Sequence, residues 1–335
     1  MNLNPNLSSL HIITLLIATA LAPHVAAQAT STSPGQAYPN KAIRMIVPFP
    51  AGGGVDFMGR ILAQKLAERV GQQVVIDNRA GSNGIIGLQA LMAAAPDGYT
   101  IASASAGPLA VNPHVYSKLP YDTLRDFTII ARGVDFPLLL LTHPSLPVKN
   151  VKDLIALAKS RPGELAAASS GSGNSDHLAL ELFKSLAKIN VIHVPYKGSG
   201  PTAIALLAGE VQLMFSSIPP TLQHIRAGKM RALGVGNAKR IPSQADFPTI
   251  AESGLPGYEA YSWGGVIGPA KMPADVVQKL NREINEVLKS KDAADRLLAG
   301  GTVPMPATPE EFTTLIRAEL QKWGAVARAA NIRAD

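Results

Sequence analysis

The sequence predicts an α/β protein of two domains, each built from a mostly parallel sheet flanked by helices. Short apolar runs with the character of strands alternate along the chain with segments whose apolar residues recur at helical spacing. The chain has 335 residues, of which 47% are hydrophobic, so it is long enough for two domains with substantial cores. Small, hydroxyl-bearing loops follow several of the strands. Because ligands bind beyond the carboxyl ends of parallel strands, these loops are candidates for a binding site.

An exported leader is expected before the fold. Residues 1–40 contain no Asp, Glu, Lys or Arg, and the apolar run at residues 12–22 is too short to span a bilayer. We interpret residues 1–27 as a signal peptide cleaved after Val25-Ala26-Ala27, with Ala27-Gln28-Ala29 as an alternative cleavage motif, and residues 28–38 as a flexible lead-in. The leader departs from the usual pattern because no Lys or Arg precedes its apolar core.

The first strand and helix are joined by a glycine-rich stretch. Residues 43–47 predict a strand, and apolar residues between 57 and 70 recur at helical spacing. Between them, Pro48 to Asp56 contains three successive glycines, which let the backbone approach a ligand closely and adopt positive φ. Amides that open a helix have no partners of their own and bind anions. An anion site and a tight turn that needs small residues explain this stretch equally well.

The remaining elements continue the alternation. Further strands are expected at residues 74–76, 99–102, 128–131, 137–142, 165–168, 191–194, 211–215, 231–235 and 262–267. Helices are expected at residues 85–92, 150–158, 178–183, 204–207, 222–225 and 273–288, and after the capping box Thr308-Pro309-Glu310-Glu311. Pro144 and Pro147 mark a crossing between domains. We therefore assign residues 39–139 and 262–335 to domain 1 and residues 140–261 to domain 2.

Three further loops repeat the chemistry of the glycine stretch. Residues 103–107 are small and hydroxyl-bearing, residues 169–175 are rich in serine, and Tyr196 follows a strand at a place suited to a pocket wall. Neither the glycine stretch nor the serine-rich loop contains Lys or Arg, so recognition there would rest on neutral donors. Hydrogen bonds to a charged group contribute about 1.5–3 kcal/mol each, and micromolar affinity needs about 8 kcal/mol. A few such donors favour a carrier that releases its ligand easily.

Composition and motifs exclude several classes of protein. The chain has no cysteine, which excludes disulfides, thiolate metal sites and a lipid anchor on cysteine. Its formal charge of +7 favours anionic ligands, but Lys and Arg are scattered and aromatic residues make up 5%, so no nucleic-acid surface is expected. The glycines match neither nucleotide-binding motif. The histidines are spread singly, and neither a metal nor a cofactor is predicted.

Several residues remain ambiguous at this point. Ser172 lies between glycines with His177 nearby, but it lacks the spacing of a nucleophile elbow, so a serine hydrolase is a weaker alternative. Asp56 could cap the first helix or face the pocket, where it would meet an ammonium, a hydroxyl or water. Lys197 could attract an anion or be solvated beside a turn.

Five separated motifs resemble one known family. PNKAIRMIVPFPAGGGVDFMGR, VIDNRAGSNGIIG, PDGYT, HVPYKGSGP and PTIAESGLPGYEAYSWGGVIGPAKMP occur in order. Together they are similar to the Bug family, the extracytoplasmic solute receptors of tripartite tricarboxylate transporters, over nearly the whole chain after the leader. The resemblance implies a periplasmic, two-domain periplasmic-binding-protein fold of type II. It implies a cleft that closes on a small carboxylate, without catalysis and without metal.

The resemblance also implies the binding residues. Carried over by motif, they are Phe49, Ala51, Gly52, Gly53, Asp56, Ser82, Asn83, Ser105, Gly107, Ser170, Ser172, Asn174, Ser175, His177, Tyr196 and Ser216. Ser216 stands where many relatives have Asp, and Gln212 replaces a frequent acidic residue before it. These departures weaken the case for an amino-acid ligand. Dicarboxylates, tricarboxylates and aromatic acids stay as the candidate ligands. We expect a monomer whose partners are membrane transporter subunits, or alternatively a membrane sensor that uses the same pocket.

Overall fold

The computed structural model describes residues 38–329 and 332–334. The predicted signal peptide and all of the lead-in except Tyr38 lie outside these residues. Within the described part of the chain, no helix combines the length and the apolar character needed to cross a bilayer.

A mixed sheet organises the described chain, with strand order β2-β1-β3-β9-β4-β7-β5-β6 and with β10 and β8 also paired to β4. Its strands are β1 (Ile43–Val47), β2 (Val74–Asn78), β3 (Thr100–Ser105), β4 (Phe127–Thr142), β5 (Ala166–Ser169), β6 (Ile192–Pro195), β7 (Leu213–Ser217), β8 (Arg231–Val235), β9 (Tyr261–Pro269) and β10 (Val303–Pro304). Strands β1, β2 and β3 are parallel, as are β5, β6 and β7, whereas β4 and β9 run antiparallel to their neighbours. The predicted α/β class is confirmed, and its parallel character belongs to the outer strands.

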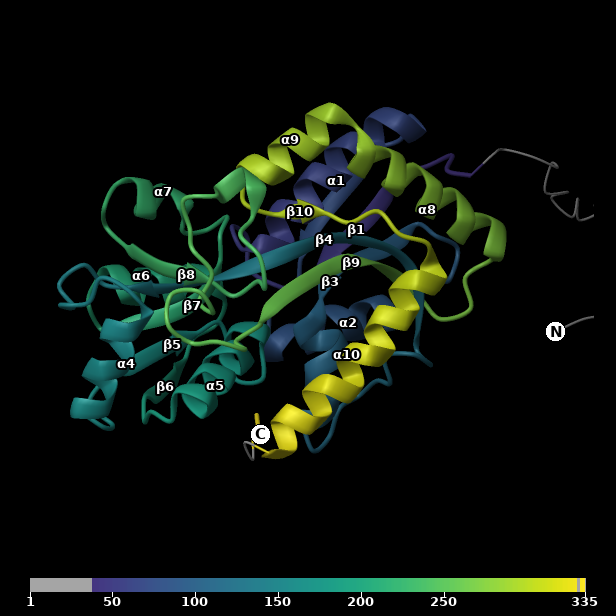
Figure 1. The fold of residues 1–335 in the computed structure, drawn as a ribbon. Coiled ribbons are helices and arrows are strands. Elements are labelled where there is room, and N and C mark those ends of the chain that lie inside the picture. Colours follow the sequence, from purple (N-terminus) through teal and green to yellow (C-terminus); the bar gives the residue numbers. More distant parts are fainter. Residues whose placement is uncertain (1–37, 330–331, 335) are drawn as a thin grey trace, which may run out of the picture. The chain divides into compact units, whose positions relative to one another are not determined.

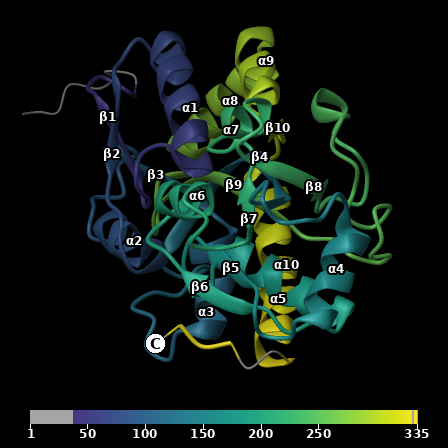
Figure 2. The same ribbon diagram turned by 90° about the vertical axis from the view of Figure 1, so that its left-hand side faces the viewer.

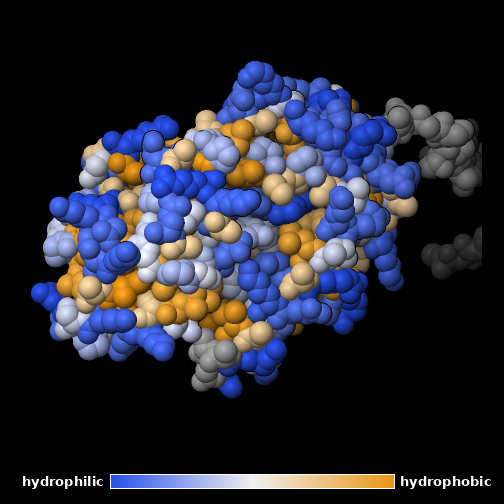
Figure 3. All heavy atoms as spheres, viewed as in Figure 1, coloured by the Kyte–Doolittle hydropathy of each residue, from blue (hydrophilic) through white to orange (hydrophobic). Residues whose placement is uncertain are grey.

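Helices cover both faces of the first half of the sheet, which contains β1, β2, β3 and β9. These helices are α1 (Gly54–Val70), α2 (Ile85–Met92), α3 (Asn112–Val115), α8 (Ala274–Lys289), α9 (Lys291–Ala299) and α10 (Pro309–Ala329). Figure 1 shows α1, α8 and α9 on one face and α2 and α10 on the other. Met45 packs with the first group and Ile46 with the second, because neighbouring residues of a strand point to opposite faces. The outer surface of α8 carries hydrophilic side chains (Figure 3).

The second half of the sheet is covered in the same way. Its helices are α4 (Val151–Ser160), α5 (Ser175–Ala187), α6 (Ser199–Leu207) and α7 (Leu222–Arg226). Leu213 and Phe183 belong to the core beneath α4 and α5, while Met214 and Leu206 belong to the core on the other face. Figure 2 views this half from its outer end, with α5 and α6 toward the viewer. Each half therefore has its own pair of buried clusters.

Strand β4 connects the two halves. The sequence predicts two strands at residues 128–131 and 137–142, whereas the structure has one strand of 16 residues. Its residues up to Pro137 pair with β9, and those from Leu138 onward pair with β7. A Cβ at Gly133 would lie 2.6 Å from Met58 Sδ and 3.2 Å from Gly264 O, so a larger residue in this part of the strand would displace its neighbours. The domain boundaries at 139 and 262 stay a prediction.

Local signals placed several helix ends correctly. Thr308 N donates to Glu311 Oε2 over 2.8 Å and Glu311 N donates to Thr308 Oγ1 over 3.1 Å, which confirms the predicted capping box. Asp153 N donates to Asn150 Oδ1 over 2.9 Å at the start of α4. Helix α9 was not predicted.

Candidate functional site

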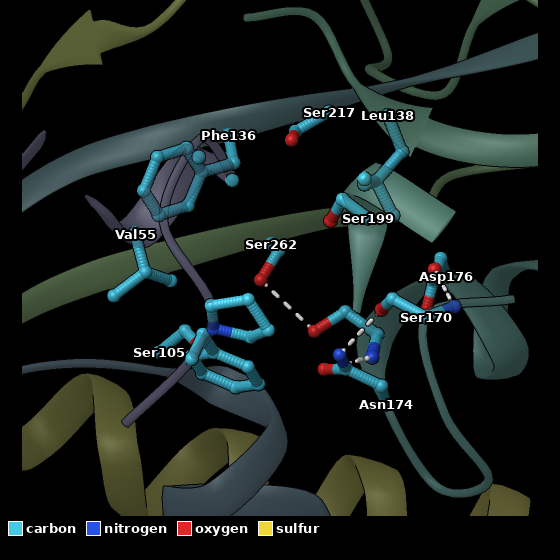
Figure 4. A pocket seen from close by; sticks show the side chains of 16 residues that line it. Val55, Ser105, Phe136, Leu138, Ser170, Asn174, Asp176, Ser199, Ser217 and Ser262 are labelled. Carbon is cyan, nitrogen blue, oxygen red and sulfur yellow. Dashed lines mark hydrogen bonds between the residues drawn. The ribbon is translucent and has the colours of Figure 1, made fainter. Parts of the chain in front are cut away.

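Two adjoining chambers lie where the two halves of the sheet meet. The inner chamber has a cavity volume of about 60 Å³ and the outer chamber about 650 Å³. Both are lined by Phe49, Pro50 and Ser170. The other residues lining the inner chamber are Gly53, Gly54, Val55, Ser105, Phe136, Leu138, Asn174, Ser175, Asp176, Ser199, Gly200, Ser217 and Ser262. Residues from the first half, the crossing strand and the second half thus share one cavity (Figure 4).

The glycine stretch forms one wall of the inner chamber. Helix α1 begins at Gly54, and its N-cap, Gly53, has φ −81° and no side chain to cap the first amides. Gly54 and Val55 of the first turn line the chamber. Amides in the first turn of a helix have no partner within the helix, so these groups are available to an anion.

Two more helices begin at the same chamber. Helix α5 begins at Ser175, whose amide is capped by Asn174 Oδ1 at 2.9 Å. Helix α6 begins at Ser199 after Gly198, which again supplies no side-chain cap. Each helix N-terminus carries a partial positive charge. Three of them begin at one small cavity, and none of the described residues that line it is Lys or Arg.

Serine hydroxyls complete the polar lining. Ser175 Oγ and Ser262 Oγ are 2.9 Å apart and join α5 to β9 across the two halves. Ser170 Oγ accepts from Asn174 Nδ2 at 2.6 Å, which fixes the serine-rich loop. Figure 4 shows Ser199 and Ser217 on the same cavity.

Apolar side chains also line the inner chamber. Phe49, Val55, Phe136 and Leu138 line it, and Figure 4 shows Val55 and Phe136 on the side away from Ser170. The chamber therefore combines neutral donors for an anion with a surface for a hydrocarbon stem.

Asp176 is the one carboxylate among the described residues that line the inner chamber. It is buried at the first turn of α5, and its Oδ2 accepts from Ser170 N at 2.6 Å while Oδ1 accepts from His177 N at 3.0 Å. Burial raises the pKa of Asp176 to about 6, although the hydrogen bonds from Ser170 and His177 oppose this shift. Its charge therefore changes in a range where a bound carboxylate is ionised.

A pair of stacked histidines supports the serine-rich loop. The rings of His177 and His193 are 3.8 Å apart between centroids and nearly parallel. His177 Nδ1 accepts from Gly173 N at 3.0 Å, and His193 Nε2 lies 2.6 Å from Ser169 Oγ. Burial lowers the pKa of His177 to about 4 and that of His193 to about 3, and for His193 the repulsion that a protonated His177 ring would exert adds to the effect. Both rings are therefore neutral at pH 7, and an unprotonated His177 Nδ1 is what acceptance from the Gly173 amide requires.

The outer chamber is larger. It is lined by Ala80, Gly81, Ser82, Asn83, Gly84, Tyr116, Gly171, Ser172, Pro195, Tyr196, Lys197, Gly198 and Ala334, besides the three shared residues. Asn83 Nδ2 donates to Asn112 Oδ1 at 2.7 Å, which leaves Asn83 Oδ1 buried and without a partner among the described residues. The Tyr196 hydroxyl donates a hydrogen bond to Glu210 Oε2 over 3.2 Å. This chamber thus offers a ligand one cation, Lys197, and an unpaired acceptor.

Comparison with known proteins identifies the family. The family model described as "Tripartite tricarboxylate transporter family receptor" matches residues 58–332. Protein BugT of Bordetella pertussis is 40% identical over 320 residues, covering 95% of this chain and 96% of BugT. The chain belongs to this receptor family.

Solved structures of related proteins agree with the fold of this receptor. "R. palustris Rpa4515 with adipate" is 37% identical with a TM-score of 0.87, covering 89% of this chain and 99% of that chain. "MatC (Rpa3494) from Rhodopseudomonas palustris with bound malate" is 30% identical with a TM-score of 0.81, covering 86% of this chain and 99% of that chain. The family consists of solute receptors rather than enzymes, and the two-domain receptor fold expected from the sequence is confirmed.

The structure of this receptor brings most of the predicted site residues together. Those in the inner chamber are Phe49, Gly53, Ser105, Ser170, Asn174 and Ser175. The outer chamber adds Ser82, Asn83, Ser172 and Tyr196. Those that line neither chamber are Ala51, Gly52, Asp56, Gly107, His177 and Ser216. The contact of each with a ligand stays a prediction.

The residues outside both chambers have contacts of their own. Asp56 accepts from Gly52 N at 2.9 Å, from Arg60 Nε at 2.8 Å and from Asn78 Nδ2 at 2.9 Å. Burial raises its pKa, but these hydrogen bonds outweigh burial and lower the pKa below its usual value. Asp56 therefore holds the glycine turn in shape. His177 supports the serine-rich loop from behind.

Some lining residues were not predicted. Ser217 lines the inner chamber in place of Ser216, because neighbouring residues of β7 face opposite sides of the sheet. Ser199 opens α6 directly after the Tyr196 loop, so a helix-start signal could have found it. Phe136 and Leu138 enter from the crossing strand, and no local pattern identifies them.

Proposed function

We propose that this receptor binds a small organic carboxylate in the periplasm and presents it to the membrane subunits of a tripartite transporter. The convergence of the N-termini of α1, α5 and α6 on one small chamber carries the proposal. Related receptors whose structures contain adipate and malate support the ligand class. Dicarboxylates, tricarboxylates and aromatic acids all belong to it.

The chamber has enough interactions for such a ligand. A helix N-terminus contributes about 0.3–1 kcal/mol to binding an anion at an exposed site and up to about 2 kcal/mol when partly buried. Each hydroxyl or amide bound to the carboxylate adds about 1.5–3 kcal/mol. Micromolar affinity requires about 8 kcal/mol. Two helix ends and three hydroxyls or amides therefore suffice without a permanent positive charge.

Ligand binding is proposed to close domain 1, residues 39–139 and 262–335, against domain 2, residues 140–261. The contact of Ser175 with Ser262 spans these two segments beside the chamber. A ligand that touches both sides favours the closed state, because only a difference in affinity shifts a conformational equilibrium. Small-angle scattering with and without ligand tests this, and an unchanged radius of gyration would contradict closure.

Identification of the natural ligand tests the ligand class. Receptor purified without refolding is denatured, and the released compounds are identified by mass spectrometry. Recovery of an organic acid at near one per protein supports the proposal. Recovery of nucleotides or sugars in that amount would overturn it.

The other predicted roles remain part of the proposal. We propose a monomer that is exported by residues 1–27, and the same pocket would equally serve a receptor that reports ligand to a membrane sensor. A hydrolase based on Ser172 gains no support, because His177 lines neither chamber and its Nδ1 accepts from the Gly173 amide.

A further inference from the structure

We propose that Gly107 is a closure seat, a position without a side chain into which Asn174 of the second half fits when an acid closes the receptor. Gly107 supports affinity by positioning Asn174 and not by touching the ligand. This inference rests on the proposed function, because it assumes that a bound acid draws the two halves together. It assigns a role to a predicted site residue that lines neither chamber.

Gly107 and Asn174 meet beside the inner chamber, across the boundary between the two halves. Gly107 opens the helical segment Gly107–Val111, two residues after Ser105, which ends β3 and lines the chamber. Asn174 lines the chamber from the other half, where it precedes α5. A Cβ on Gly107 would lie 2.3 Å from Asn174 Oδ1 and 3.3 Å from Asn174 Cγ. The first distance is far below a van der Waals contact, so a side chain at position 107 would displace Asn174 or keep the halves apart.

The backbone at Gly107 does not itself require glycine. Its φ lies outside the positive range that favours glycine, and its carbonyl accepts from Asn112 N within a helical segment. Alanine is favoured over glycine in a helical backbone, because glycine loses more conformational freedom on folding. The three nearest atoms that an added Cβ would meet all belong to Asn174. The approach of Asn174 from the other half therefore explains why this position has no side chain.

Asn174 is held in the position in which it meets Gly107. Its Oδ1 accepts from Ser175 N at 2.9 Å, and its Nδ2 donates to Ser170 Oγ at 2.6 Å (Figure 4). Its backbone N donates to Gly171 O at 3.2 Å. Rotating the side chain away breaks both of its side-chain hydrogen bonds, one of which caps the first amide of α5. A methyl group at position 107 is therefore not accommodated by free rotation of Asn174, and it acts against closure.

The contact acts on one state of the receptor. Gly107 belongs to the first half and Asn174 to the second, so their contact exists only while the halves are together, like that of Ser175 with Ser262. A change confined to the closed state lowers the affinity for ligand and leaves the stability of the open, ligand-free receptor unchanged. Because the open state captures the ligand, the loss is expected in the dissociation rate and not in the association rate.

Gly107→Ala tests the seat. A panel of adipate, malate, citrate and benzoate identifies the acid that wild-type receptor binds most tightly. Calorimetry then measures the affinity for this acid, and stopped-flow displacement measures its dissociation rate. Gly107→Ala should bind the acid about 5- to 150-fold more weakly, equivalent to about 1–3 kcal/mol, through faster dissociation. Without ligand, the variant should unfold at no lower temperature than the wild type, because alanine suits the helical backbone.

Gly268→Ala is the matched control. An added Cβ at Gly268 would lie 2.0 Å from Met272 Sδ, a similarly close contact that lies entirely within the first half. Gly268 lines neither chamber, and its φ is also outside the positive range. Gly268→Ala should therefore unfold at a lower temperature without ligand and keep its affinity for the acid, the opposite of Gly107→Ala.

Asn174→Ser tests the partner of the seat. Serine still caps a helix, but it has no atom in the place of the Oδ1 that an added methyl group would meet. Asn174→Ser itself should weaken binding, because Asn174 lines the inner chamber and fixes Ser170. In that background, Gly107→Ala should weaken binding by less than about 2-fold, so the effects of the two substitutions are not additive.

The other outcomes overturn the inference. Wild-type affinity in Gly107→Ala refutes the seat while carboxylate binding stands. A Gly107→Ala variant that does not fold, or that loses as much ligand-free stability as Gly268→Ala, shows that the contact belongs to the fold and not to closure. An equal loss of affinity in the Asn174→Ser background shows that Gly107 meets the ligand or another group. If no acid binds to wild-type receptor that unfolds cooperatively on heating, the proposed function fails and the inference fails with it.

Discussion

A methyl group added at Gly53 is expected to block the ligand without harming the fold. A Cβ at this position would lie 3.8 Å from Ser199 Oγ and 3.9 Å from Pro50 O, which are ordinary contacts. The methyl group would therefore fit the protein and occupy part of a chamber of about 60 Å³. Overfilling a packed site costs about 1–3 kcal/mol, which corresponds to a loss of affinity of about 5- to 150-fold. Gly53→Val should lose more affinity than Gly53→Ala, because its side chain fills more of the chamber.

The stability of Gly53→Ala should change little. Gly53 has φ −81°, which alanine adopts without strain. Alanine is a poorer N-cap by about 0.5–1 kcal/mol, but it also restricts the unfolded chain by about 0.4–1 kcal/mol, so the two effects nearly cancel. Calorimetric titration with the bound acid measures affinity, and thermal unfolding without ligand measures stability.

Gly52→Ala is the matched control. Gly52 has φ +88°, so alanine there is strained by about 1–2 kcal/mol, but its Cβ would meet no atom within 4 Å and it lines neither chamber. This variant should lose stability and keep its affinity, the opposite of Gly53→Ala. If both variants lose affinity in proportion to stability, the glycine stretch is a structural turn and the reasoning is refuted.

Three other side chains give further predictions. Asp176→Asn should flatten the pH dependence of acid binding: in the wild type, affinity rises from pH 7.5 to 5.5, because Asp176, whose pKa is about 6, takes up a proton and stops repelling the ligand. A wild-type affinity that is the same at pH 7.5 and pH 5.5, or a variant with the same pH dependence as the wild type, would contradict this. As the pH falls from 6.5 toward 4, the free energy of unfolding should fall, because unfolded histidine binds protons there while His177 and His193 stay neutral in the fold. In denaturant titrations at several pH values, His193→Gln should lower the number of protons taken up on unfolding by about one. Asp56→Ala should lose about 2–3 kcal/mol of stability, measured by urea unfolding, since it frees Arg60 and two other donors; a loss below 0.5 kcal/mol would exclude a structural role.

Much of the fold could be predicted from local patterns in the sequence. The strands β1 and β8 and the capping box at Thr308 were predicted because short apolar runs and capping residues act through neighbouring positions. The sequence predicts two strands in place of β4 because the apolar runs at residues 128–131 and 137–142 are separated by a segment that contains Arg132 and Asp135. In the fold these two side chains form an ion pair, and β4 continues past them.

In the candidate site, too, residues within one contiguous segment could be predicted, whereas residues placed by long-range packing could not. The glycine stretch and the serine-rich loop were found because each is one contiguous segment that opens a helix. Phe136 and Leu138 were not found, because their place in the chamber depends on where β4 passes from one half to the other. The two chambers and the position of Lys197 at the outer one follow from packing between segments far apart in the sequence.

Recognition of a carboxylate by three helix N-termini is the central claim, and one calorimetric comparison tests it most directly. Ligand-free receptor is titrated with the identified acid and with the primary amide that replaces its carboxylate. The acid should bind with micromolar or lower Kd, and the amide at least 100-fold more weakly, because it lacks the charge that the helix ends and hydroxyls stabilise. Equal binding of acid and amide would contradict the claim.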